Sequence, residues 1–95
     1  MGLTTTIATA APPAWPVVAA RLAARNRPVQ MRLIDGQPAF PDEAPPDHWR
    51  ELRVASAGRM VTIRRTAAGI DLVTFGNADP DALAFRDELA HAFTA

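Results

Sequence analysis

The sequence contains no cysteine, no lysine and no tyrosine, and it carries no excess of charge of either sign. Without cysteine, disulfides, thiolate metal sites and thiol nucleophiles are excluded. The ten basic residues, all arginine, balance ten acidic ones, and this neutrality argues against a dedicated binder of nucleic acid or anionic membranes. The lack of lysine beside abundant alanine matches the codon bias of a GC-rich genome, so we expect a bacterial source.

Long hydrophobic runs are also missing. No stretch approaches the ~18 apolar residues of a membrane helix, and the first six residues lack the basic segment of a secretory signal. We therefore expect a cytoplasmic protein. A length of 95 residues allows one domain with one core. The large core candidates are few, and the aromatic ones are Trp15, Phe40, Trp49, Phe75, Phe85 and Phe93.

Local signals divide the chain into a tail and one domain. Residues 1–13 are rich in threonine and alanine without a clear period, so we expect a mobile tail there and a single domain over 14–95. The patterns predict a short helix over 17–25, strands over 29–34, 37–40, 50–55, 60–65 and 70–75, and a longer helix from 80 to about 93. Asp35-Gly36 is a hairpin signal, Pro38 restricts its strand to an edge, and Asp79-Pro80 starts the last helix.

Short connections between consecutive strands favour antiparallel neighbours. The sequence therefore predicts an α+β fold, in which an antiparallel meander of three to five strands is flanked by a short N-terminal helix and a longer C-terminal helix.

The register of the last hairpin decides which residues share a face of the sheet. If Gly69 takes a left-handed conformation and closes a bulged turn, Val61 lies opposite Phe75 and Ile63 opposite Val73. This register, which we predict, leaves Met60, Ile70 and Leu72 on the opposite face. A two-residue turn at Ala67-Ala68 would instead align Ile63 with Leu72. In both registers apolar residues lie on both faces, and two helices cannot cover both.

Because apolar residues are predicted to stay uncovered, we expect the protein to associate with a partner. No catalytic set of residues is apparent, so we expect a non-enzymatic protein-interaction module without a cofactor or metal. We expect it to be a homodimer or an adaptor subunit, with itself or another protein as its partner. The predicted interaction face consists of Met60, Ile70 and Leu72.

An alternative function is binding of nucleic acid or another polyanion by an arginine-rich sheet. The candidate residues are Arg50, Arg53, Arg64 and Arg65. Glu51 and Asp71 alternate with them, which favours cross-strand salt bridges and makes nucleic acid the weaker expectation.

One spacing is typical of a metal site. Asn77, Asp79, Asp81 and Glu88 fall at the ligand positions of a calcium-binding EF-hand loop, but Ala82 occupies the position where that loop needs glycine. A helix start at Asp79 explains the same residues more simply, because aspartate and proline are typical of a first helical turn.

Overall fold

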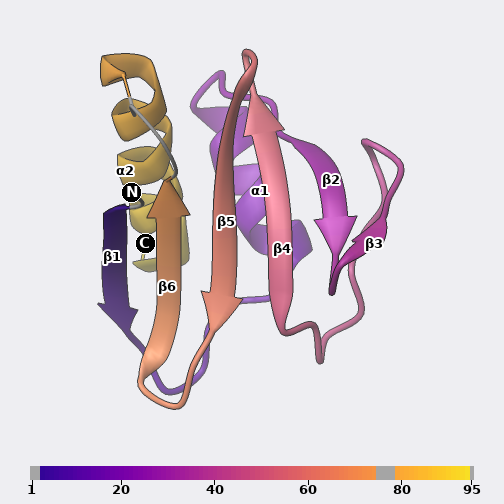
Figure 1. The fold of residues 1–95 in the computed structure, drawn as a ribbon, viewed down its shortest axis with the longest axis vertical. Helices are drawn as coiled ribbons and strands as arrows, with labels where there is room; N and C mark the ends of the chain where they lie inside the picture. The colour runs from indigo at the N-terminus through magenta and orange to yellow at the C-terminus, as the bar shows by residue number, and fades with distance from the viewer. Residues whose placement is uncertain (1–2, 75–78, 95) are drawn as a thin grey trace.

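The computed structural model describes residues 3–74 and 79–94, which form an α+β fold with a six-stranded antiparallel sheet and two helices (Figure 1). In chain order the elements are β1 (Leu3–Ala8), α1 (Trp15–Ala24), β2 (Gln30–Ile34), β3 (Gln37–Pro38), β4 (Glu51–Ser56), β5 (Arg59–Arg65), β6 (Gly69–Thr74) and α2 (Pro80–Thr94). Both helices lie behind the sheet in Figure 1, so one face of the sheet is covered and the other is open. The predicted fold class is confirmed, with six strands in place of three to five.

The strands are ordered β1-β6-β5-β4-β2-β3 across the sheet, and every neighbouring pair is antiparallel. β4, β5 and β6 form the predicted meander, while β2 and β3 form the predicted hairpin at one edge. Pro38 lies in this edge strand, where its missing N–H costs no hydrogen bond within the sheet.

The sixth strand corrects the prediction for residues 1–13. Leu3–Ala8 does not form a tail: it is β1, and it pairs along its whole length with β6. Ile7 lies opposite Ile70 and is buried, and Thr6 Oγ1 donates a hydrogen bond of 2.8 Å to Asp71 Oδ1. Three consecutive threonines hide the alternation that would reveal a strand, although β-branched residues suit one once a neighbour is present.

The turn between β5 and β6 contains two residues, Ala67 and Ala68, and lacks the bulge that we predict. Thr66 and Gly69 exchange two backbone hydrogen bonds across it, with N–O distances of 2.7 and 3.3 Å. Gly69 has a φ of +149°, and a Cβ atom there would lie 2.0 Å from the carbonyl oxygen of Ile7. The position therefore requires glycine for two reasons: β1 approaches it closely, and residues with a Cβ atom rarely adopt this φ.

This turn sets a register that differs from the predicted one. Ile63 lies opposite Leu72, so the predicted pairing of Ile63 with Val73 is wrong. The predicted pairing of Val61 with Phe75 involves a residue outside the described ranges. The observed register is the one that we assigned to a two-residue turn.

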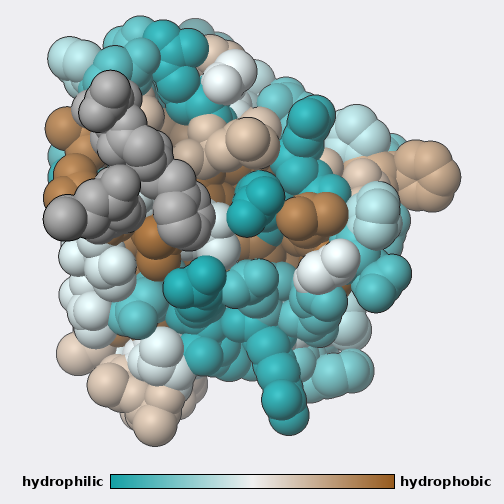
Figure 2. Space-filling view, viewed as in Figure 1, coloured by the Kyte–Doolittle hydropathy of each residue, from teal (hydrophilic) through white to brown (hydrophobic). Residues whose placement is uncertain are grey.

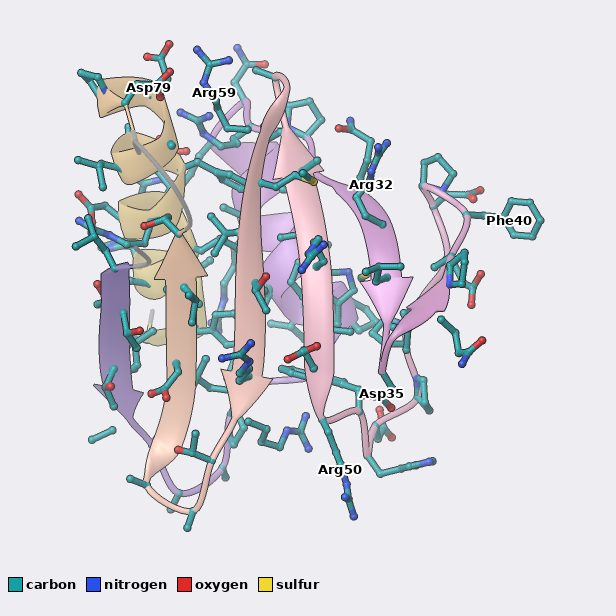
Figure 3. The ribbon with its side chains drawn as sticks, in the orientation of Figure 1. Arg32, Asp35, Phe40, Arg50, Arg59 and Asp79 are labelled. Carbon is teal, nitrogen blue, oxygen red and sulfur yellow. The ribbon has the colours of Figure 1, made fainter. Side chains whose placement is uncertain are left out.

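The large apolar side chains of the meander gather on the covered face. The fully buried ones are Leu52, Val54, Val61, Ile63, Ile70 and Leu72. α1 packs on them through Trp15, Val18 and Leu22, and α2 through Phe85, Leu89 and Phe93. The prediction that Met60, Ile70 and Leu72 share an uncovered face is therefore wrong, because Ile70 and Leu72 belong to the core. Phe40, a predicted core residue, is 74% exposed and points away from the sheet (Figure 3).

Polar contacts fasten the two helices to each other. Arg27 forms an ion pair with Glu88, and its guanidinium lies 5.7 Å from the centroid of the Phe85 ring. Arg21 Nη1 donates a hydrogen bond of 2.8 Å to the carbonyl oxygen of Ala92 near the C-terminus of α2. Arg21 in α1 and Arg27 just after it therefore connect α1 to α2. Long side chains of this kind also pack their methylene groups on apolar surface.

The start of α2 confirms the predicted cap. Asp79 Oδ1 accepts a hydrogen bond of 2.8 Å from the amide of Ala82, and Pro80 is the first residue of the helix. Arg59 lies beside this cap (Figure 3), with 2.8 Å between Arg59 Nη2 and Asp79 Oδ2. The hydrogen bond from Arg59, followed by that from Ala82, lowers the pKa of Asp79 below its ordinary value.

A second aspartate ties the β2–β3 turn to β4. Asp35 and Gly36 both have positive φ, +51° and +81°, as a tight hairpin turn requires. Asp35 Oδ1 accepts hydrogen bonds from the amides of Glu51 and Arg50, at 2.9 and 2.8 Å. These two amides, that of Glu51 first, lower the pKa of Asp35.

We expect Gly69→Ala to lower the free energy of unfolding by about 3 kcal/mol or more, because the new Cβ would force β1 and β6 apart. Gly36→Ala is the matched control: its φ is also positive, but no atom lies within 4 Å of the new Cβ. The free energy of unfolding of the control should fall only by the ~1–2 kcal/mol that a left-handed conformation costs a residue with a Cβ atom. Urea unfolding measures both losses, and equal losses would contradict the close approach of β1.

We expect Asp35→Asn to destabilise the protein at neutral pH and to matter less in acid. Because folding lowers the pKa of Asp35, its stabilisation is present above the unfolded value of about 3.8 and disappears as the pH falls through the folded pKa. Urea midpoints of wild type and variant should therefore converge from pH 6 to roughly pH 2. Asp42→Asn, in an exposed loop, is the control. A difference in urea midpoint between wild type and Asp35→Asn that stays constant with pH would refute the role of the charge.

Candidate interaction surface

The open face of the sheet, which Figure 2 turns toward the viewer, is largely hydrophilic with a few apolar spots. The strand registers place on it Thr4 and Thr6 of β1, Asp71 and Val73 of β6, Met60, Thr62 and Arg64 of β5, Glu51, Arg53 and Ala55 of β4, and Gln30, Arg32 and Leu33 of β2. Met60, half exposed, is the one residue of the predicted interaction face that lies here.

Cross-strand contacts engage some of the charged side chains on this face. Arg64 Nε lies 2.6 Å from Glu51 Oε1, and Asp71 accepts the hydrogen bond from Thr6. Among the described residues, Arg32 and Arg53 have no such carboxylate partner. Arg53 Nε instead lies 3.4 Å from Thr62 Oγ1 on the adjacent strand, a long hydrogen bond that orients its guanidinium.

The four arginines of the predicted polyanion site do not form one surface. Arg53 and Arg64 lie on the open face, and Arg50 projects beyond the end of β4 (Figure 3). Arg65 pairs with the buried Ile70 and is directed toward the covered side. Its guanidinium stacks 4.3 Å from the centroid of the Trp49 ring and donates a hydrogen bond of 3.0 Å to the carbonyl oxygen of Asp47. A continuous basic stripe is therefore not formed by this set.

A groove opens where β2, β4 and β5 meet the start of the loop that follows β3, at Ala39 and Pro41. It has a volume of about 470 Å³ and is lined by Met31, Arg32, Leu33, Ala39, Pro41, Arg53 and Met60. A register shift between Met31 and Leu33 marks a bulge at Arg32, so Leu33 lies opposite Arg53. A bulge changes the direction of side chains along a strand. Here it places Arg32 and Leu33 together on the groove.

The two edges of the sheet differ in what they offer to another strand. β3 has only two residues, one of them Pro38, so that edge is blocked. β1 is six residues long, uncharged and free of proline, and no other element lies beyond it in Figure 1. It is therefore the edge that can accept a strand.

The alternation of hydrogen bonds along β1 shows which of its residues direct their backbone groups away from the sheet. The amide of Thr9 bonds to Ala68 on the β6 side at 3.2 Å, and in an antiparallel pair inward and outward residues alternate. The odd-numbered residues of β1 therefore bond to β6. Thr4, Thr6 and Ala8 direct their N–H and C=O groups away from the sheet.

The residues of the calcium hypothesis have other roles. Asn77 lies outside the described residues, Asp79 caps α2 and binds Arg59, and Glu88 pairs with Arg27. Within residues 3–74 and 79–94, no group of three or more acidic or histidine side chains could hold a metal ion.

Sequence reasoning missed two parts of this surface. The bulge at Arg32 leaves no signal in the sequence, since the alternation of apolar and polar residues continues through Arg32 and Leu33. The outward residues of β1 could have been found only from the β-branched run Thr4-Thr5-Thr6-Ile7, which we assigned to a tail.

Comparison with protein-family models, with curated proteins and with solved structures finds no match for this chain. Neither α1 nor α2 is long and apolar enough to cross a membrane.

Proposed function

We propose that this chain is a non-enzymatic protein-interaction module that forms a homodimer by pairing β1 with β1 of a second copy. The observation that carries the proposal is the free, uncharged edge of β1, with its row of outward backbone groups. Strand addition satisfies such groups through main-chain hydrogen bonds.

The sequence of β1 suits pairing with itself. A two-fold axis through Thr6 sets Thr6 opposite the second copy's Thr6, and Thr4 opposite its Ala8, with all three residues directing backbone groups to the partner. No like charges meet, and threonine pairs are favourable cross-strand neighbours. Leu3, half exposed beside this edge, would gain cover.

The neutral chain permits association, and the blocked second edge favours a closed dimer over a longer assembly. A net charge of zero adds no long-range repulsion between copies. Because β3 cannot accept a strand, growth stops once the two β1 edges have paired.

This interface replaces the predicted one. The reason for expecting a dimer through Met60, Ile70 and Leu72 was an uncovered apolar face, and the two helices cover Ile70 and Leu72 completely. Leu72→Arg would be the natural variant to weaken the predicted interface. Because Leu72 is buried, this change would place a charge in the core and would test the stability of the fold, not dimer formation.

We expect Thr6→Pro to weaken the dimer and to leave the fold intact. Proline removes an N–H that points away from β6, so the β1–β6 ladder keeps its hydrogen bonds. The two bonds lost across the symmetric Thr6 pair correspond to about 1–3 kcal/mol, or roughly 5- to 150-fold in the dimer Kd. Sedimentation equilibrium over a concentration series measures this change.

Thr6→Val is the matched control, because it loses the same hydroxyl contact with Asp71 but keeps the backbone N–H. It should dimerise as the wild type does, and circular dichroism should show both variants folded. A wild-type protein that stays monomeric at high micromolar concentration, or a Thr6→Pro variant that dimerises unchanged, would refute the proposal.

A further inference from the structure

The groove between β2, β4 and β5 is lined by two of the arginines that have no carboxylate partner among the described residues. Among the described residues, Arg27, Arg59, Arg64 and Arg86 form ion pairs with carboxylates, whereas Arg32 and Arg53 do not. Both line the groove, from neighbouring strands. Two cationic groups without an anion create a local excess of positive charge on a molecule that is neutral as a whole.

The positions of these arginines are built into the backbone. Arg32 follows the covered Met31 and lies on the open face by ordinary alternation, and the bulge brings Leu33 to the same face, opposite Arg53. Arg53 is half-buried, and Thr62, itself buried, holds its Nε. Among the described residues the terminal nitrogens of Arg53 have no acceptor, so they can bind one from a ligand.

The rest of the lining is apolar. Met60, Leu33, Ala39 and Pro41 form the walls around the two guanidiniums, and Met60 is half exposed. The volume of about 470 Å³ lies in the range of small-molecule sites, roughly 300–1,000 Å³. A ligand that fits this lining has an anionic head and an apolar body.

We propose that this groove binds an organic phosphate, in which a phosphate monoester lies between Arg32 and Arg53 and its apolar body contacts Met60. A phosphate monoester carries about −1.5 to −2 charges near neutral pH, which matches two guanidiniums better than a single carboxylate does. Arginine also binds phosphate with two parallel hydrogen bonds. The site lies on β2, β4 and β5, away from the β1 edge, and is independent of dimer formation.

The test is a titration with phenyl phosphate, followed by NMR of the methionine methyl groups. The Met60 signal is assigned with Met60→Leu. We expect the Met60 methyl to shift saturably, and Arg32→Gln and Arg53→Gln each to weaken binding about tenfold. Arg50→Gln, which removes an exposed arginine outside the groove, is the matched control and should bind as the wild type does.

Further probes separate the parts of the proposal. Inorganic phosphate and phenol should each bind more weakly than phenyl phosphate, because each lacks one half of the ligand. Phenylacetate binding as tightly as phenyl phosphate would overturn the preference for a divalent head. The site itself would be refuted by no shift of Met60 at about 10 mM phenyl phosphate, well above the ~1 mM of a weak complex. An equal loss in Arg50→Gln would refute it too, since binding would then follow overall charge. None of these outcomes depends on whether the protein is a dimer.

Discussion

Thr66 and Gly69 exchange two backbone hydrogen bonds across the turn at Ala67-Ala68, and this pair sets the register of β5 against β6. Side chains alternate along a strand, so a slip of one residue would move every apolar side chain of β6 to the other face. In the observed register Ile63 and Leu72 lie opposite each other on the covered face. Both helices can then pack on one side, and the other side stays open and polar.

Gly69 also connects this register to the edge of the sheet. Only a residue without Cβ lets the backbone of β1 approach, and β1 then covers the outer side of β6 with Ile7 opposite Ile70. Among the described residues, the sheet therefore ends in β1, and no strand pairs with its outer backbone groups. The opposite edge ends in Pro38, which cannot donate a hydrogen bond. One edge is open and one is blocked, and this difference is the physical argument for the closed dimer that we propose.

The elements that the sequence predicts well are those with a local signal. Asp35-Gly36 marks a turn by its own conformational preference, and Asp79-Pro80 marks a helix start by its own capping chemistry. The β1 strand and the bulge at Arg32 depend on contacts between distant segments, and the β5–β6 register depends on which of two possible turns the chain forms at residues 66–69. Ile7 meets Ile70 across 63 positions of sequence, and no local pattern reports such a contact. The fold class was therefore predictable, while the candidate surface was not.

The arginines show how position decides the role of one residue type. Arg27 stacks on Phe85 and Arg65 on Trp49, so their side chains complete the covered side of the sheet. Arg64 meets a carboxylate on the open face, whereas Arg32 and Arg53 do not among the described residues. A dimer formed through β1 would join two sheets edge to edge about an axis perpendicular to them, with both open faces on the same side.

The two grooves would then lie far from the β1 interface on one continuous surface, because β2 and β4 are on the opposite half of each sheet. Association and anion binding would use separate parts of that surface. Neither would have to displace the other, since the backbone hydrogen bonds of β1 and the guanidiniums of Arg32 and Arg53 belong to different strands.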